Sequence, residues 1–125
     1  MSPVIRRILA IHAIALGAGY LAGPVQWYSG STFTVVRSLG VPIPLWGAVF
    51  VLAGVLLAVG RPTAGHALAL AAFAFWGGAL AASIPQGQLS AWGSPVHNLL
   101  VAAPLHALGL WQRRQSRVDR RAGRT

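Results

Sequence analysis

Residues 43–84 read IPLWGAVFVLAGVLLAVGRPTAGHALALAAFAFWGGALAASI, and Arg61 is the single charged residue among them. The stretch contains two long apolar segments, 43–60 and 64–84, joined by a short turn. A helix needs about 20 residues to cross the roughly 30 Å hydrocarbon core of a bilayer, and about 17 residues is the lower limit. We therefore predict two membrane-spanning helices joined by a tight hairpin.

Further apolar segments flank this hairpin on both sides, at residues 4–23 and 95–111. The first meets the length requirement easily, and the last is close to the lower limit. The fold predicted from this pattern is all-α: an integral membrane four-helix bundle in residues 1–112, followed by a basic, disordered cytoplasmic tail in residues 113–125. Pro104 is expected to kink the last helix, because proline lacks a backbone N–H.

The arginines fall almost entirely on one side of this predicted bundle. All ten basic residues are arginine, and Arg37 alone lies in the loop that faces the other side. The other nine are Arg6, Arg7, Arg61, Arg113, Arg114, Arg117, Arg120, Arg121 and Arg124. Short cytoplasmic loops carry an excess of basic residues. We therefore predict a multi-pass protein of the cytoplasmic membrane with both termini in the cytoplasm.

The overall composition supports this interpretation. Hydrophobic residues make up 55% of the chain and charged residues 9%, whereas about a quarter of the residues in soluble domains are charged. The formal charge is +9, but the basic residues border apolar segments and have no aromatic residues interleaved among them, so nucleic acid is not an expected partner. Anionic lipid headgroups are an expected partner. The tail residues expected to contact them are Arg113, Arg114, Arg117, Arg120, Arg121 and Arg124. The use of arginine without lysine is typical of a GC-rich genome.

The first predicted outer loop contains a short candidate helix at residues 33–39. Ser31 or Thr32 is expected to cap it. Phe33, Val36 and Leu39 are then predicted to lie together on the membrane interface.

Small residues recur at four-residue spacing in two of the predicted spans. The stripes are Ala15, Gly19 and Gly23 in the first span, and Ala74, Gly78 and Ala82 in the third. Small residues allow helices to approach closely in lipid, where hydrophobic burial provides little drive. We predict close packing along at least one stripe, either within the chain or between copies in a homo-oligomer.

Four histidines lie within or beside the apolar segments. His12, His66 and His106 are expected to face one another in the cytoplasmic half, whereas His97 and Asn98 begin the last span on the outer side. One interpretation is a metal, haem or proton site at His12 and His106, since imidazole ligates metals and titrates near neutrality. The favoured one is that His12, His97, Asn98 and His106 are interhelical or lumen-lining polar groups.

Catalytic groups are scarce in this sequence. Asp119 is the single acidic residue, so neither a carboxylate pair nor a Ser-His-Asp set can form within the membrane. Cysteine is absent, which excludes disulfides and thiolate metal sites. We predict a protein that is not an enzyme and that holds neither a cofactor nor a metal.

In size, hydropathy and basic tail the chain resembles phage holins. The resemblance implies a small membrane protein that oligomerises and permeabilises the cytoplasmic membrane during cell lysis. Its oligomer contacts would then lie along stripes such as those of Gly19 and Gly78.

A second resemblance concerns one span. Leu45-Trp46-Gly47, followed by Gly54-Val55-Leu56-Leu57 and Gly60-Arg61, is similar to the second-span pattern of small DoxX-like four-helix proteins. That resemblance implies a membrane accessory or assembly protein that binds a partner membrane complex. The span lacks the acidic residue that a redox or transport role would favour.

Overall fold

The computed structural model describes residues 1–24, 26, 29–30, 33–84 and 93–123, and the regular elements in those ranges are helices. In chain order they are α1 (Pro3–Ala22), α2 (Thr34–Ser38), α3 (Ile43–Ala58), α4 (Pro62–Ser83), α5 (Gly93–Val96), the π-helical turn η5 (His97–Ala102) and α6 (Ala103–Arg121). The all-α class is confirmed. By length and apolar composition α1 and α4 are able to cross a membrane, whereas α3 is apolar but has 16 residues.

The helices begin where the sequence provides proline or a cap. Pro3, Pro44 and Pro62 each lie in the first two positions of a helix, where the missing N–H costs nothing. Ser2 also caps α1, and its Oγ accepts a hydrogen bond from the N–H of Ile5 at 3.2 Å. Gly60 ends the α3 side of the hairpin with a φ of 82°, a conformation that glycine adopts without strain.

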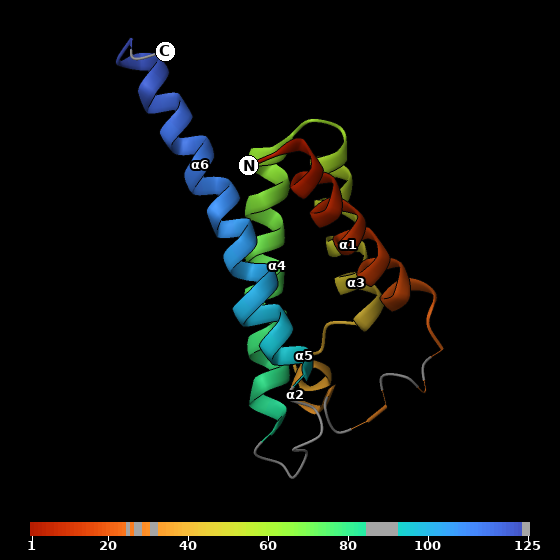
Figure 1. Ribbon diagram of the computed structural model, residues 1–125. Coiled ribbons are helices and arrows are strands. Elements are labelled where there is room, and N and C mark those ends of the chain that lie inside the picture. The colour runs from red at the N-terminus through yellow and green to blue at the C-terminus, as the bar shows by residue number, and fades with distance from the viewer. Residues whose placement is uncertain (25, 27–28, 31–32, 85–92, 124–125) are drawn as a thin grey trace.

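The helices pack in chain order, α1 on α3, α3 on α4, and α4 on α6 (Figure 1). The N-terminus, the turn between α3 and α4, and the C-terminal end of α6 lie at one end of the bundle. The short helices α2 and α5 lie at the other end. Helix α6 extends beyond the other helices, so its last turns leave the bundle.

Helices α1 and α3 approach closely because glycines lie at their contact. A Cβ placed on Gly17 would come within 2.5 Å of the carbonyl oxygen of Gly47 and 2.7 Å of the backbone nitrogen of Val51. A Cβ on Gly54 would lie 2.7 Å from the carbonyl oxygen of Ala10. Glycine is therefore required at these positions for the backbones to come this near each other.

The core between α1, α3 and α4 is aromatic. Phe50, Phe73 and Trp76 are completely buried, and the indole N–H of Trp76 donates to the hydroxyl of Tyr20 at 2.9 Å. The rings of Tyr20 and Trp76 meet edge to face at a centroid distance of 4.8 Å. Aromatic pairs favour this arrangement.

Helix α2 forms in the predicted place but packs differently. Val36 is completely buried, whereas Leu39 is 43% exposed and Phe33 is half-buried near the ring of Trp76. The N–H of Val35 donates to Ser83 Oγ at 3.2 Å, which holds α2 against the end of α4. The expectation that Phe33, Val36 and Leu39 share the membrane interface is therefore wrong. The predicted caps, Ser31 and Thr32, lie outside the described residues.

The last predicted span is one continuous helical run through α5, η5 and α6. Pro104 lies two residues after Ala102, the end of the π turn, and the N–H of Ala103 donates to the carbonyl of Asn98, five residues earlier. The predicted disordered tail is instead helical as far as Arg121. The tail forms a helix because arginine and glutamine favour helices, and because no glycine or proline occurs between Leu110 and Arg121.

Candidate functional site: a line of histidines ending at a basic pocket

Two buried histidines meet between α4 and α6. The Nδ1 atoms of His66 and His106 are 3.0 Å apart, a hydrogen-bond distance in which one ring donates and the other accepts. His66 is 2% exposed and His106 is fully buried. The structure thus brings together two of the three histidines expected to face one another.

His12 takes a different partner. Its Nε2 lies 3.0 Å from the Nε2 of His97, and the two rings meet edge to face. His97 was expected on the outer side of the bundle, away from His12. This second pair joins α1 to η5 and is the more exposed of the two.

Phe73 links the two pairs. Its ring stacks on His12 at a centroid distance of 5.3 Å and on His106 at 5.4 Å. The order through the bundle is therefore His97, His12, Phe73, His106 and His66. Because a phenyl ring carries no hydrogen-bonding group, the two histidine pairs are polar units separated by an apolar ring.

The neighbours of His106 indicate which histidine nitrogens carry protons. Nε2 of His106 is buried without a hydrogen-bond partner. An orphaned buried N–H is rarer in proteins than an unpaired acceptor, so we assign the proton of His106 to Nδ1. Nδ1 of His66 then accepts, and its Nε2 carries an N–H.

Asn98 lies in the same π turn as His97 but does not line an opening. It is 3% exposed, and its Nδ2 donates to the carbonyl of Ser94 at 2.7 Å. Its Oδ1 is buried without a partner. Leu99 and Asn98 pack against Gly77, where an added Cβ would come within 2.8 Å of the Asn98 Cβ.

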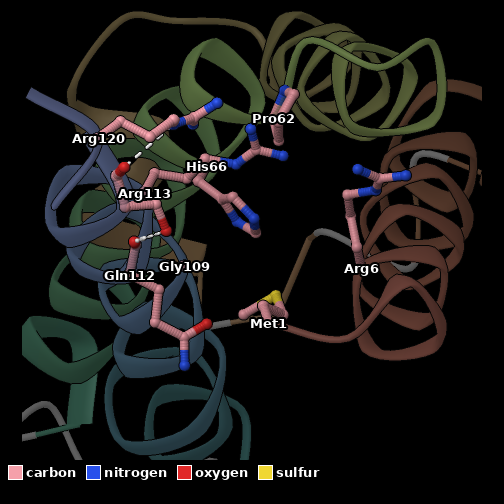
Figure 2. Close-up of a pocket in the computed structure, with 9 residues that line it drawn as sticks. Met1, Arg6, Pro62, His66, Gly109, Gln112, Arg113 and Arg120 are labelled. Atoms are coloured by element: carbon pink, nitrogen blue, oxygen red, sulfur yellow. Dashed lines mark hydrogen bonds between the residues drawn. The ribbon is translucent and has the colours of Figure 1, made fainter. Parts of the chain in front are cut away.

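The His66 end of the line opens into a basic pocket of about 220 Å³ (Figure 2). Its wall consists of Met1, Arg6, Pro62, His66, Gly109, Gln112, Arg113, Ser116 and Arg120. Arg6 lies on α1 at one side of His66, and Arg113 and Arg120 come from α6 on the other side. Gly109 leaves room for the imidazole, since a Cβ there would lie 2.7 Å from His66 Nε2.

The predicted packing stripes face outward. Ala15, Gly19, Ala74, Gly78 and Ala82 are exposed, and a Cβ on Gly19 or Gly78 would meet open space. Gly23 is partly buried and caps the C-terminus of α1. Close packing within the chain therefore uses Gly17 and Gly54 instead, and packing of the two stripes between copies stays a prediction.

The arginines predicted to contact lipid lie on the projecting half of α6. Arg113, Arg114, Arg117, Arg120 and Arg121 are exposed, and Arg124 lies outside the described residues. Arg117 Nη2 reaches Thr63 Oγ1 at 3.4 Å, and Arg120 Nε donates to the carbonyl of Ser116 at 3.1 Å. Arg113 and Arg120 face the basic pocket as well.

Sequence reasoning missed Phe73, Arg6 and Gln112 as parts of the site. The four-residue spacing of Ala69, Phe73 and Gly77 would have placed Phe73 on one face of its helix, but not opposite two histidines.

Within the described ranges, no three His, Asp or Glu side chains converge as metal ligands do. Comparisons of the chain with known protein families, curated proteins and solved structures find no match.

Proposed function

We propose that the chain is a four-span protein of the cytoplasmic membrane that self-associates and permeabilises that membrane, as holins do. In this arrangement both termini and the turn at Arg61 face the cytoplasm, which agrees with their position at one end of the bundle. The second span, α3, is the shortest, and 16 residues extend about 24 Å. Its flanking residues or a thinner bilayer would have to accommodate that length.

The proposal of self-association is based on the small residues of the outer face of α4. Its exposed residues follow a three- and four-residue spacing and, apart from Phe75, all are alanine or glycine: Ala64, Ala67, Ala71, Ala74, Gly78 and Ala82. The outer faces of the other two apolar helices instead carry large side chains, among them Val4, Ile5, Ile8 and Ile11 on α1 and Leu45, Leu52, Val55 and Val59 on α3.

This contrast distinguishes a helix-packing face from a lipid-facing one. Lipid chains pack well against large aliphatic side chains, whereas a stripe of small residues lets another helix approach closely. The alternating spacing matches the small crossing angle common among membrane helices. A second copy of α4 is therefore the occupant that this face fits best.

Permeabilisation requires a second conformational step. The polar side chains His66, Asn98 and His106 are buried between α4 and the last helix. A water-filled lesion would need such groups on its wall, so helices must separate or rotate after the copies associate. A delay between accumulation and opening follows from this requirement.

Controlled expression in a bacterial host tests the proposal. We expect abrupt loss of membrane potential after a delay, and Gly78→Leu should prevent or postpone it at matched membrane abundance. Ala48→Leu is the control, because Ala48 is an exposed small residue on α3, outside the stripe. Polarised, viable cells that contain abundant inserted wild-type protein would refute the lytic role.

A second candidate is an accessory protein that binds a partner membrane complex. The ordered line of histidines beside a basic pocket favours it, since a lesion-forming protein has no evident need for such an arrangement. The same expression experiment separates the two candidates, because an accessory protein would leave the potential unchanged.

A further inference from the structure

We propose that the basic pocket at the end of the histidine line binds a phosphate-bearing anion. This inference does not depend on the lytic role, because it concerns what the folded monomer binds. The chemistry recognised is a phosphate group, which either a phospholipid headgroup or phosphate in solution provides.

The pocket gathers positive charge from two separate helices. Arg6 is near the start of α1, while Arg113 and Arg120 are two turns apart on α6 (Figure 2). Guanidinium groups match the geometry of phosphate oxygens and form charge-assisted hydrogen bonds with them. Convergence from two helices makes this a concave site, which differs from the outward-facing arginines elsewhere on α6.

Among the described residues that line the pocket, none has a carboxylate side chain. Asp119 is the single acidic side chain in the whole chain, and it does not line the pocket. Two hydrogen bonds of the wall stay within α6: Arg120 Nε donates to the carbonyl of Ser116, and Ser116 Oγ donates to the carbonyl of Gln112. Both acceptors are neutral carbonyls, so the positive charge of Arg120 is not cancelled. The positive charge facing the cavity is therefore available to an anion.

His66 adds a neutral donor at the inner end. It lines the cavity while being 98% buried, and the tautomer assigned above leaves its Nε2 carrying a proton. Gly109 lets the backbone of α6 pack against this ring, since a Cβ there would lie 2.7 Å from Nε2. Three arginines and one N–H donor thus surround the cavity without a competing carboxylate.

The depth of the pocket suits a lipid phosphate. It lies at the end of the bundle that carries the N-terminus and the α3–α4 turn, where a membrane-inserted chain would meet the cytoplasmic headgroups. The open side of the same pocket would also admit phosphate from the cytoplasm. Two probes are needed to separate these sources.

The test uses the full chain in nanodiscs of a galactolipid, which carries no phosphate, with or without phosphatidylglycerol. Retention of phosphatidylglycerol is measured by native mass spectrometry, and inorganic phosphate is titrated calorimetrically in the discs of galactolipid alone. We expect Arg6→Gln and Arg113→Gln each to weaken binding about tenfold, the scale of one charge-assisted hydrogen bond. Arg7→Gln and Arg114→Gln remove the same charge from the adjacent residue of each helix and should change binding less than twofold.

The two probes distinguish the source of the bound phosphate. Selective loss of phosphatidylglycerol retention identifies the lipid phosphate as the ligand, and selective loss of inorganic phosphate binding identifies the soluble anion. Equal weakening by the pocket variants and their neighbours would reduce the effect to general surface charge and overturn the proposal. Absence of binding in both arms, with circular dichroism showing folded protein, would overturn it as well.

Discussion

Trp76 donates its indole N–H to the hydroxyl of Tyr20 in the buried centre of the bundle, joining α4 to α1 over 2.9 Å. Trp76 is completely buried and Tyr20 is 8% exposed, so the indole N–H has little access to another partner. The bond therefore fixes how α1 and α4 are rotated relative to each other. Everything else that the two helices share, including the stacking of His12 on Phe73, depends on that rotation.

Removal of this bond should lower stability measurably. Tyr20→Phe leaves the indole N–H of Trp76 buried without its partner, and we expect a loss of about 1 kcal/mol in the free energy of unfolding. The measurement is denaturation in mixed micelles followed by tryptophan fluorescence. A Trp76→Phe and Tyr20→Phe double-mutant cycle supplies the control, and additive losses would contradict the bond.

Alanine substitutions at two glycines of α1 should have opposite effects on stability, because only one of the two glycines lies at the contact with α3. Gly17→Ala places a methyl group 2.5 Å from the carbonyl oxygen of Gly47, and we expect a loss of about 1–3 kcal/mol in unfolding free energy. Gly19→Ala, two residues away on the outer face, meets open space and should stabilise α1 by up to about 1 kcal/mol. Similar effects for both variants would show that α1 does not pack on α3 through this face.

The histidine pair His66 and His106 should behave as a coupled unit. His106→Phe alone leaves the imidazole of His66 without its partner, so we expect a loss of unfolding free energy of about 1–2 kcal/mol. His66→Phe with His106→Phe removes both polar groups and should recover part of that loss. No recovery in the double variant would contradict the pairing. The more exposed pair, His12 and His97, should show weaker coupling in the same cycle.

Self-association through α4 is open to disulfide crosslinking, because the chain has no cysteine of its own. Ala74→Cys should form dimers rapidly on oxidation, since small-residue packing brings Cβ atoms near the roughly 3.8 Å that a disulfide requires. Leu52→Cys, on the outer face of α3, is the control and should crosslink slowly. Equal rates at the two positions would exclude α4 as the preferred contact.

The proposed topology is checked by labelling with a membrane-impermeant maleimide. Ser38→Cys should react in intact spheroplasts, and Ser116→Cys only after the membrane is opened. Gly78→Leu serves as the background, because it should keep the membrane sealed. Labelling of Ser116→Cys in intact cells would contradict a cytoplasmic C-terminus.

The helices were predictable because their signals are local. Apolar length, Pro44, Pro62 and the Gly60 turn each act within a few residues, and each predicted apolar segment is helical over most of its length. The tail was mispredicted because its charge was taken as a sign of disorder, although arginine itself forms helices well.

The contacts between helices were less accessible from the sequence. The buried stripe of α1 runs through Ala10, Ala13 and Gly17, whereas the predicted one contained Gly19. Both stripes consist of small residues, so composition does not distinguish them, and only the rotation of the helix does. The same reason explains why His12 was assigned to the wrong histidine.

The π turn at His97–Ala102 has a consequence for the phase of the last helix. Such a turn accommodates one extra residue, and each residue of an α-helix accounts for about 100° of rotation. If the same residues formed a regular α-helix, α6 would be rotated about its axis by about 100° relative to His97. His97 and His106 would then no longer face His12 and His66 together. The extra residue in the π turn therefore sets the rotation at which His97 meets His12 and His106 meets His66.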